Sequence, residues 1–520
     1  MKTFLKILSL FAFIAFFVGT RFPRMGTETF NTDEVYWHTR SQNFLNALIT
    51  KNYVETFQKY HPGVPLMWEF SITALVSSKL NHTSIDATFA NWEKLHVDTM
   101  LTLNIWVLAL SLLGIVVWGK ALKNWWVAIL TFVVLNLEPF YLGNARLIHH
   151  DAQAAVYVML GLGLVYLATS KKFNLFLTIS ASFFLALAML TKSIYAGAFM
   201  FCLFAGSLLV FLNQGFKKAL FFFIALFSSS IGFYFLMFPA LWVAPGNTLG
   251  LIFNQSRRVG EDEGHAQIYF GQDTRNPGFF FYPVLFVIKT SIFLLIGSAI
   301  FYLDVIFKFF KNLKNKVYQK LAEIPFEIFT FIFYLGYFSV IQYFSKKVDR
   351  YVLPIYPFLA LATVLGWAAF IKKRIYLVVI PLALFVYSVA YPLYKLFPDY
   401  LMYNSPVIGD AAVGNEIIGT KLFGIGIFDL REKIIARYGD KAKIGTSDFG
   451  PLKALYPNGV VYNVLVAHPN DFKVMILGPN KPFPPSLKNE PTLKFYKVDS
   501  VYINGLEFWR IYQKKVVSAL

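Results

Sequence analysis

Long apolar runs alternate with short polar segments through most of the first 394 residues. Each run approaches the ~20 residues that a helix needs to cross a bilayer. The pattern predicts about eleven helical spans, at residues 4–20, 99–119, 124–143, 151–170, 173–191, 194–213, 218–243, 281–305, 326–344, 351–371 and 374–394. The expected fold class is therefore an α-helical polytopic membrane protein.

Three longer and more polar stretches lie outside these runs. We expect residues 21–98 to form a long first loop and residues 244–280 to form a second large loop. The remaining stretch, 395–520, follows the last span and is less apolar. Residues 1–394 are thus predicted to be the transmembrane domain, and 395–520 a small soluble α/β domain.

The pattern inside the tail supports that division. An amphipathic helix is predicted over 428–438 and short strands over 443–445, 459–462 and 474–477. Asn504-Gly505 lies between two runs of β-forming residues, and this dipeptide is a strong signal for a two-residue β-hairpin.

Positive charge in the short loops sets the expected orientation. With the N-terminus in the cytoplasm, the loops on that side carry Lys120, Lys123, Lys171, Lys172, Lys217, Lys218, the 308–320 cluster, Lys372, Lys373 and Arg374. An odd number of spans then places both large loops and the tail outside. We expect an integral protein of a prokaryotic plasma membrane. The first apolar run favours a retained signal-anchor over a cleaved signal peptide, because no small-x-small motif precedes residues 20–24.

Composition agrees with a membrane protein. Of the 520 residues, 57% are hydrophobic and 15% charged, and the mean hydropathy is +0.53. The net charge of +19 would suggest nucleic acid in a soluble protein, but here it sits mainly in loops beside lipid headgroups. The single cysteine, Cys202, excludes an intrachain disulfide.

Several cations break the positive-inside pattern. They lie near the predicted outer ends of spans, where a charge costs free energy, or in the second large loop, and are Arg146, Lys192, Arg257, Arg258, Lys289, Lys346, Lys347 and Arg350. A shared reason is an anionic ligand at the outer interface, such as a lipid phosphate, which suits both Arg and Lys. The alternative for any one of them is snorkelling to the interface without a ligand.

Two acidic sites lie on the same predicted face. Asp33 and Glu34 open an amphipathic helix after the first span, and Asp151 enters the fourth span at its outer end. A carboxylate in a partly dry site can accept a proton from a hydroxyl. The alternative is helix capping, with Thr32 or Asp33 as one N-cap and Asp151 as another.

A further acidic stretch, Glu261-Asp262-Glu263-Gly264-His265, could hold a divalent ion, although a solvated loop is the favoured interpretation. No cofactor is required by the sequence, and a divalent metal is left open.

An ordered series of short motifs resembles the C-type membrane glycosyltransferases, specifically the bacterial branch akin to polyprenyl- or dolichyl-phosphate-mannose protein mannosyltransferases and the aminoarabinose transferases. The matching residues are Asp33-Glu34, Tyr60-His61-Pro62-Gly63, Arg146 with Asp151, Thr191-Lys192, His265 with Tyr269-Phe270-Gly271, Phe281-Tyr282-Pro283 with Lys289-Thr290, and Arg350-Tyr351-Val352-Leu353-Pro354-Ile355-Tyr356-Pro357. The series covers the whole membrane part, whereas the tail does not match the eukaryotic members.

The resemblance implies inverting transfer of a sugar from a polyprenyl-phosphate donor to an extracytoplasmic protein, lipid or glycan. It implies Asp33 as the base, supported by Glu34 and Asp151. It offers as donor-phosphate ligands Arg350, Lys347, Lys289, Lys192 and Arg146, and as substrate-binding residues His61, His149, His265, Tyr269 and Tyr351.

Two other functions fit a basic polytopic chain. A flippase or transporter of a lipid-linked glycan would show paired halves with broken helices at mid-depth, and no such symmetry is visible in the sequence. A scaffold whose tail binds a partner would not need a motif-rich first loop. An enzyme is therefore the favoured class.

Overall fold

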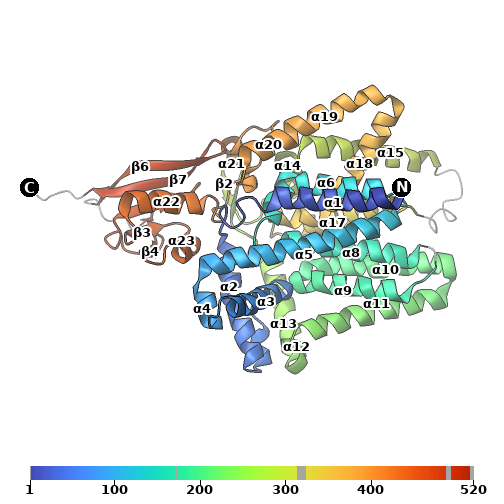
Figure 1. Ribbon diagram of the computed structural model, residues 1–520, viewed down its shortest axis with the longest axis horizontal. Coiled ribbons are helices and arrows are strands. Elements are labelled where there is room, and N and C mark those ends of the chain that lie inside the picture. Colours follow the sequence, from blue (N-terminus) through green and yellow to red (C-terminus); the bar gives the residue numbers. More distant parts are fainter. Residues whose placement is uncertain (1, 171, 313–323, 486, 488–492, 516–520) are drawn as a thin grey trace, which may run out of the picture.

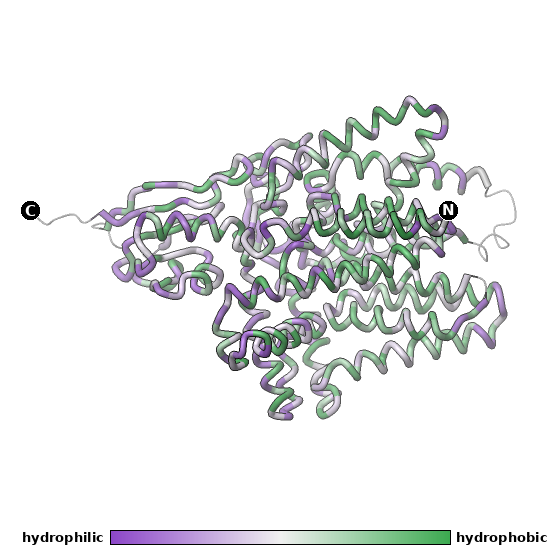
Figure 2. The backbone as a smooth tube through the Cα atoms, in the orientation of Figure 1, coloured by the Kyte–Doolittle hydropathy of each residue, from purple (hydrophilic) through white to green (hydrophobic). Residues whose placement is uncertain are grey.

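The computed structural model describes residues 2–170, 172–312, 324–485, 487 and 493–515. The molecule is elongated, with a bundle of long helices at one end and the small sheet of the tail at the other (Figure 1). The N-terminal end of the first helix lies at the bundle's far end, opposite that sheet. Hydrophobic residues dominate the bundle, and hydrophilic ones are commoner in the tail and at the junction (Figure 2).

Most of the predicted apolar runs form single helices. These are α1 (Lys2–Arg21), α5 (Trp92–Ala121), α8 (His150–Thr169), α9 (Leu175–Thr191), α10 (Ala196–Gln214), α11 (Phe216–Met237), α17 (Phe326–Tyr343) and α18 (Tyr356–Lys373). Two predicted runs are broken, namely α6 (Trp125–Leu137) with α7 (Pro139–Ala145), and α14 (Phe281–Lys289) with α15 (Ile292–Asn312). The last run is one continuous helix of mixed type, made of η5 (Ile375–Val378), α19 (Val379–Phe385), η6 (Val386–Ala390) and α20 (Tyr391–Leu396).

The breaks bear on the number of spans. Among the described residues, eight helices are long and apolar enough to cross a membrane, or nine if α6 and α7 count as one span bent by 76°. That bend falls at Glu138-Pro139, where the proline ring cannot continue the α6 hydrogen-bond ladder. Helix α9 has only 17 residues, and the run 281–305 divides between α14 and α15. The figure of about eleven crossings therefore stays a prediction.

Helix α8 lies at the centre of the bundle, buried along almost all of its length. Glycines allow its neighbours to approach closely. A Cβ on Gly161 would lie 2.7 Å from Leu185 of α9, and one on Gly163 would lie 2.7 Å from Val117 of α5. This packing fixes the position of the first turn of α8, which carries Asp151.

The first large loop is mostly helical. It contains α2 (Thr32–Ile49), η1 (Tyr53–Thr56), α3 (Val64–Leu80) and α4 (Ile85–Ala90). Gly63 precedes α3 with φ +60°. A Cβ on this glycine would lie 2.1 Å from the ring of Trp37, so the turn carrying His61 packs directly against α2.

The second large loop is shorter and lies beside the first. It contains α12 (Ala240–Val243), α13 (Pro245–Arg257), the π-helical turn η3 (Arg258–Glu263) and a hairpin of β1 (Gln267–Tyr269) and β2 (Gln272–Thr274). Trp242 of α12 contacts Tyr53 of η1, with ring centroids 5.2 Å apart. The two loops thus pack on each other at the end of the bundle nearest the tail (Figure 1).

The tail is an α/β unit, as the sequence predicts. Its five-stranded sheet has the order β4-β3-β5-β7-β6. The strands are β3 (Lys443–Thr446), β4 (Val460–Asn463), β5 (Val474–Leu477), β6 (Lys494–Ile503) and β7 (Leu506–Lys515), and the helices are α21 (Ala411–Ile417), α22 (Ile427–Tyr438) and α23 (Phe449–Leu455). Strands β3, β4 and β5 are parallel, and β7 is antiparallel to β5 and β6.

The predicted hairpin at Asn504-Gly505 is confirmed, with φ of 47° and 80° as a type I′ turn needs.

Residues 418–426 of the tail, which we call the tail loop, pack on the rest of the molecule. Its Ile425 pairs with Thr29, and Ile418 pairs with Tyr269 of β1, both in antiparallel bridges. A Cβ on Gly424, which has φ +64°, would lie 1.9 Å from the carbonyl oxygen of Phe30. The tail loop is therefore pressed against the segment that leads into α2.

Candidate functional site

Asp33 lies in the first turn of α2, at the junction of loop, bundle and tail. The N-cap is Asn31, whose side chain accepts a hydrogen bond of 2.8 Å from the backbone N–H of Glu34. The prediction of Thr32 or Asp33 as the cap is thus wrong by one or two positions, because an Asn side chain satisfies the same orphan donor. Asp33 is left free to contact other elements, and its side chain is 38% exposed.

Asp151 occupies the first turn of α8 and is fully buried. The cap of this helix is His149, so Asp151 is not the N-cap either. Its carboxylate ion-pairs with Lys192, which follows α9, and accepts a hydrogen bond of 3.3 Å from the hydroxyl of Tyr195. A buried carboxylate with these partners is held rigidly.

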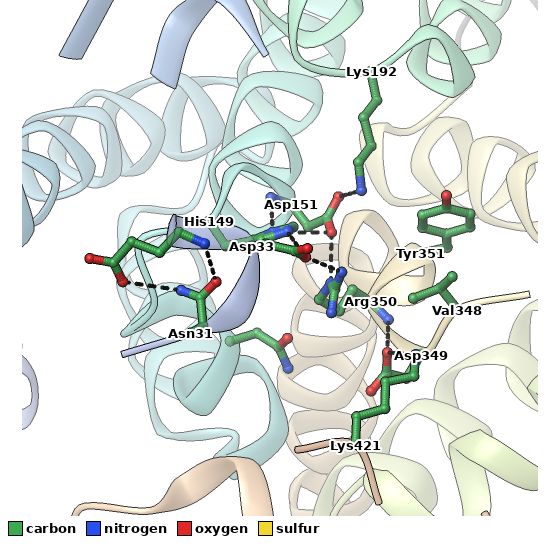
Figure 3. A network of polar contacts seen from close by, with 12 residues as sticks. Asn31, Asp33, His149, Asp151, Lys192, Val348, Asp349, Arg350, Tyr351 and Lys421 are labelled. Atoms are coloured by element: carbon green, nitrogen blue, oxygen red, sulfur yellow. Dashed lines mark hydrogen bonds and ion pairs between the residues drawn. The ribbon is translucent and has the colours of Figure 1, made fainter. Parts of the chain in front are cut away.

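Arg350 bridges the two carboxylates. It lies in η4 (Asp349–Ile355), directly before α18. Its Nε donates to Asp151 Oδ2 at 3.1 Å, and one terminal nitrogen donates to Asp33 Oδ2 at 2.9 Å. Figure 3 shows the guanidinium between the two acids. Residues from positions 33, 151 and 350 therefore converge at one point, as the transferase interpretation requires.

His149 completes the bridge from the other side. Its Nδ1 accepts a hydrogen bond of 3.3 Å from the backbone N–H of Asp151. That contact leaves the ring proton on Nε2, which lies 3.1 Å from Asp33 Oδ2 and donates to it. Burial lowers the pKa of His149, which favours this neutral form.

The partners of Asp33 decide its charge. Burial raises the pKa of the Asp33 carboxyl, but the hydrogen bond from His149 and the charge of Arg350 outweigh that effect. The net result holds its pKa below the usual range for aspartate. Asp33 is therefore an ionised carboxylate, partly exposed and fixed in direction.

A large, mainly apolar cavity opens beside this cluster. Its empty space, including the open mouth, is about 1040 Å³, and its walls include Tyr60, His61, Lys192, Lys346 and Tyr351. We call it the loop-side cavity, because the first and second loops supply much of its wall. Lys346 donates to the Tyr60 hydroxyl at 3.3 Å. Within the described part of the chain, no carboxylate lies in ion-pair distance of the Lys346 ammonium.

A second cavity lies where the bundle meets the tail loop, and we call it the tail-side cavity. It has about 660 Å³ of empty space, again including its mouth, and is lined by Lys289, Asp349, Arg350, Lys421 and Phe423 among others. Arg350 lines this cavity, while the next residue, Tyr351, lines the loop-side one. The η4 turn thus forms the wall between the two.

Three expected site residues point elsewhere. Glu34 faces away from Asp33 and forms a buried pair with His96 Nδ1 at 2.5 Å, because adjacent helix positions lie about 100° apart. Arg146 makes two hydrogen bonds to the buried carboxylate of Glu28. Lys347 donates to the backbone carbonyls of Gln342 and Phe344.

The remaining expected residues surround the site without joining the Asp33 cluster. His61 stacks on Tyr60 with ring centroids 4.7 Å apart. The ring centroid of Tyr351 lies 4.8 Å from the ammonium of Lys192. Tyr269 packs on Phe281 beside the tail-side cavity. Burial lowers the pKa of His265 to about 4, and Lys421 and Lys346 act in the same direction.

Sequence reasoning missed the contribution of the tail. Lys421 lies 3.6 Å from Asp349, and the ring centroid of Phe423 lies 4.6 Å from the Arg350 guanidinium carbon. Neither residue belongs to a motif. The one available signal was the Phe-Gly-Ile-Gly run at 423–426, which is typical of a constrained turn.

Metal ligation can be tested on the geometry. Within the described ranges, a single group brings three ligand-type side chains together: one ligand atom each of His149, His150 and Asp151, all within 4.8 Å. Both ring nitrogens of the buried His150 lack a hydrogen-bond partner, which suits a ligand. However, the oxygens of Asp151 already pair with Lys192 and Arg350. With two cations on its carboxylate, this group does not fit a divalent ion.

The acidic stretch of the second loop gives no metal site in the described part of the chain. Glu261 pairs with Arg257 at 3.2 Å, and Glu263 pairs with Arg258 at 2.9 Å. All four side chains are at least 40% exposed. The solvated-loop interpretation therefore holds for these residues.

Comparison with known proteins identifies the fold. No protein-family model matches the sequence, and no curated protein matches it significantly. ArnT from Cupriavidus metallidurans, crystallised bound to undecaprenyl phosphate, aligns over 100% of this chain and 99% of its own, with a TM-score of 0.52 and 12% identity. In the apo state ArnT aligns over 98% of both chains, with a TM-score of 0.51 and 14% identity.

An oligosaccharyltransferase from Archaeoglobus fulgidus, tethered to an acceptor peptide, aligns with a TM-score of 0.48 and 12% identity, over 92% of this chain and 69% of that one. The ArnT alignments cover both chains nearly end to end. The expected C-type membrane glycosyltransferase fold, tail included, is thereby confirmed.

Proposed function

We propose that this chain, which shares the fold of ArnT, transfers a sugar with inversion from a polyprenyl-phosphate donor to an acceptor hydroxyl on the extracytoplasmic side of the membrane. The observation that carries this proposal is the bridge Asp33–Arg350–Asp151 at the wall between two cavities. This reaction needs an ionised carboxylate that is open to the acceptor. It also needs cations beside an apolar groove.

The loop-side cavity fits the donor. Its lining is predominantly apolar, as a polyprenyl chain requires, and it contains Lys192, Lys346 and Tyr60. Lys346 has a tyrosine hydroxyl as its polar partner, so its charge is available to a phosphate. ArnT has been crystallised with undecaprenyl phosphate, which supports a donor of this class here.

Asp33 is the proposed base. The acceptor O–H gives its proton to the Asp33 carboxylate while the acceptor oxygen bonds to the anomeric carbon. The bond from that carbon to the phosphate oxygen breaks, and its electron pair leaves with the polyprenyl phosphate. Lys346 and Lys192 stabilise the charge on the leaving group. Attack from the face opposite the phosphate inverts the anomeric centre.

The other polar residues of the cluster position Asp33. Arg350 and His149 each donate to Asp33 Oδ2, which directs the second oxygen, Oδ1, toward the acceptor. Asp151 pairs with both Lys192 and Arg350, so this carboxylate holds the guanidinium in place. No metal ion enters this scheme.

The proposed orientation follows from charge and shape. Lysines and arginines favour a cytoplasmic N-terminus, and the N-terminal end of α1 lies opposite the tail sheet (Figure 1). The first loop, the second loop and the tail would then share the extracytoplasmic side, with residues 1–394 as the membrane domain and 395–520 as the soluble domain. Both cavities would open at that side of a prokaryotic plasma membrane.

The donor class can be tested directly. Lipid that copurifies with the full chain in mild detergent is extracted and analysed by mass spectrometry. We expect a polyprenyl phosphate or its glycosylated form, and much less of it with Lys346→Met. The matched control is Lys443→Met, an exposed lysine at the start of β3. Recovery of only bulk phospholipid, identical in all three proteins, would refute the donor assignment.

The base is tested by Asp33→Asn. With a polyprenyl-phosphate sugar and an acceptor extract from the host envelope, we expect transfer to fall by at least about 100-fold, within the range for loss of a general base. Retention of donor lipid by this variant separates loss of chemistry from loss of binding. Full activity in Asp33→Asn would contradict the assignment, and donor movement across the bilayer without sugar transfer would favour the flippase.

A further inference from the structure

Helix α2 carries a cation on the same face as the proposed base. Asp33, Trp37 and Arg40 lie four and then three residues apart, so their side chains share one side of the helix. The Arg40 guanidinium carbon lies 4.7 Å from the ring centroid of Trp37 and 5.5 Å from that of Tyr36. The side chain therefore leans back toward the helix N-terminus, which brings its charge toward Asp33. Burial lowers the pKa of Arg40, and the charge of Asp33 opposes that effect.

The donor groups of Arg40 are unused. Within the described ranges, Arg40 forms no ion pair and donates no hydrogen bond. The side chain is half-buried, yet none of its nitrogens is a buried atom without a partner, so its N–H groups are open to solvent. A guanidinium held against two rings is fixed in direction, and its planar fork suits an anion that offers two oxygens.

Two lysines extend this positive charge around Tyr60. The ammonium of Lys59 lies 5.5 Å from the Tyr60 ring centroid, and that of Lys346 lies 6.0 Å from it. Burial, then the charges of Arg40 and Lys346, lower the pKa of Lys59. In the part of the chain that the structure describes, none of these three cations pairs with a carboxylate. We call Arg40, Lys59 and Lys346 the rim cations.

The acids near the rim cations are already paired. Asp33, Asp151 and Glu263 act on Lys346 through their charge. Asp33 and Asp151 share Arg350, and Glu263 pairs with an arginine of its own loop. The rim is therefore left with an excess of positive charge, and gathering like charges costs free energy when no anion is bound among them.

The rim cations lie beside the cavity that fits the donor. Tyr60 and Lys346 line the loop-side cavity. Trp37, on which Arg40 stacks, contacts His61 of the same wall, with ring centroids 5.6 Å apart. A ligand in this cavity can therefore reach the rim.

The excess charge is larger than the proposed donor requires. A polyprenyl phosphate joined to a sugar is a phosphodiester and carries one negative charge. Lys346, together with Lys192 in the same cavity wall, suffices to neutralise it. Arg40 and Lys59 then remain as two unmatched cations beside the bound donor.

We propose that Arg40 and Lys59 bind a second anionic group of the donor, in addition to the phosphate assigned to Lys346 and Lys192. This inference rests on the proposed function and adds the chemical class of the donor. Arg40 shares a helix face with Asp33, and the sugar lies between the phosphate and this base. The position therefore favours an anionic substituent of the sugar, such as the carboxylate of a uronic acid. A second phosphate in the linkage is the other source of such a charge.

The competing interpretation is structural: Arg40 would only fasten Tyr36 and Trp37 by cation–π contacts, and Lys59 would be a solvated surface charge. Such roles predict a lower melting temperature for Arg40 variants. They predict no change in the preference of the folded protein for a more highly charged donor. Donor selectivity therefore separates the two interpretations.

The full chain, purified in detergent, is titrated calorimetrically with two pairs of lipids. Undecaprenyl-phosphate glucose and undecaprenyl-phosphate glucuronic acid differ only at the sugar carbon that bears the carboxylate. Undecaprenyl phosphate and undecaprenyl diphosphate differ only in the second phosphate. Arg40→Gln and Lys59→Met remove one charge each, and Arg40→Lys retains it. Arg437→Gln is the matched control, because this exposed arginine stacks on Tyr438 in the tail.

We expect the wild-type protein to bind the glucuronic acid lipid at least about tenfold more tightly than the glucose lipid, as for one charge-assisted hydrogen bond. Arg40→Gln should lose this preference while its affinity for the glucose lipid is unchanged, and Lys59→Met should reduce the preference. Arg40→Lys should retain part of it, and Arg437→Gln all of it. A preference for diphosphate over monophosphate that depends on Arg40, with none for glucuronic acid, would identify the second phosphate as the source. Either preference supports the subsite.

The proposal is overturned if the wild-type protein shows neither preference, or if its preference survives unchanged in both Arg40→Gln and Lys59→Met. If one variant fails to fold, the other decides. Failure of the proposed function is distinguishable, because undecaprenyl phosphate itself would then not bind. If undecaprenyl phosphate binds and the second charge adds no affinity, the subsite alone is refuted.

Discussion

The hydroxyl of Thr32 donates a hydrogen bond of 3.0 Å to Asp448, a residue 416 positions later in the chain. Asp448 is buried and also accepts from the backbone N–H of Gly424 in the tail loop. Thr32 directly precedes Asp33, so this one carboxylate ties the tail loop to the N-terminal turn of α2. The tail thereby helps to fix the proposed base.

The first prediction concerns this contact. Thr32→Val removes the hydroxyl without changing side-chain size, so α2 is less well anchored beside Asp33. We expect the transfer rate to fall by about 10-fold, since small displacements of a reacting group are costly, with undecaprenyl phosphate affinity unchanged. Thr32→Ser should restore the rate.

The matched control is Thr39→Val on the same helix, where the exposed hydroxyl bonds only to the Val35 carbonyl. Steady-state kinetics at varied donor concentration separate the turnover number from KM. A purely structural contact would instead lower the melting temperature and leave the turnover of the folded protein as it was.

The second prediction is the pH dependence of transfer. The hydrogen bond from His149 and the charge of Arg350 together outweigh burial and hold the pKa of Asp33 below its usual value of about 3.9. The ionised base, and the stability it contributes, is therefore present above that value and lost only as the pH falls further. Wild-type transfer should stay flat from neutral pH down to about 5.

Arg350→Gln removes the positive charge but leaves Asp33 partly buried, so the transfer rate of this variant should fall at a higher pH than that of wild type. Rates measured from pH 4.5 to 8 test this shift. Arg24→Gln, an exposed arginine 3.6 Å from Asp429, should leave the profile unchanged. If the transfer rate falls at the same acidic pH in Arg350→Gln and in wild type, Asp33 is not the titrating base.

The third prediction separates two adjacent acids. Glu34 is buried and paired with His96, with no contact to Arg350 or Asp151. Glu34→Gln should lower the free energy of unfolding by about 1–3 kcal/mol, as expected for a weakened buried hydrogen bond. The folded fraction should transfer sugar at the wild-type rate.

Thermal melting in detergent, with transfer assayed below the melting temperature, tests this prediction. Asp33→Asn is the comparison, since it should lose transfer even in its folded fraction. If Glu34→Gln loses transfer while its stability is unchanged, Glu34 takes part in catalysis together with Asp33.

The fourth prediction concerns Asp399, a half-buried acid at the junction of bundle and tail. Burial, then the neighbouring Asp429 and Glu28, raise the pKa of Asp399 to about 7, and its Oδ1 has no hydrogen-bond partner. A raised pKa means that the stability contributed by this group is present below its unfolded value and is lost as the pH rises through about 7.

Asp399→Asn should therefore melt closest to wild type below about pH 4, where the wild-type carboxyl is protonated in both folded and unfolded chains, and be more stable by about 1–3 kcal/mol at pH 8. The exposed Asp262→Asn is the matched control and should change little at either pH. Equal melting of Asp399→Asn and wild type at pH 8 would contradict the prediction.

The sequence by itself determined most of the long apolar helices and the terminal hairpin of this protein. The apolar runs, the amphipathic segment before Tyr438 and the Asn504-Gly505 turn are local patterns, and the helices and hairpin follow them within a few residues. Local periodicity suffices because backbone hydrogen bonds within a helix or a tight hairpin depend on near neighbours. The ordered motifs also led to the correct fold.

Tertiary structure decided which residues meet. Asp33 and Glu34 are adjacent in sequence, yet one faces Arg350 and the other His96. Arg350 reaches the carboxylates, whereas Lys347, three residues earlier, turns to backbone carbonyls. The direction of a side chain depends on how its helix is rotated against elements hundreds of residues away. For the same reason Lys421 and Asp448, which lie in no motif, emerged only from the packing of the tail on the bundle.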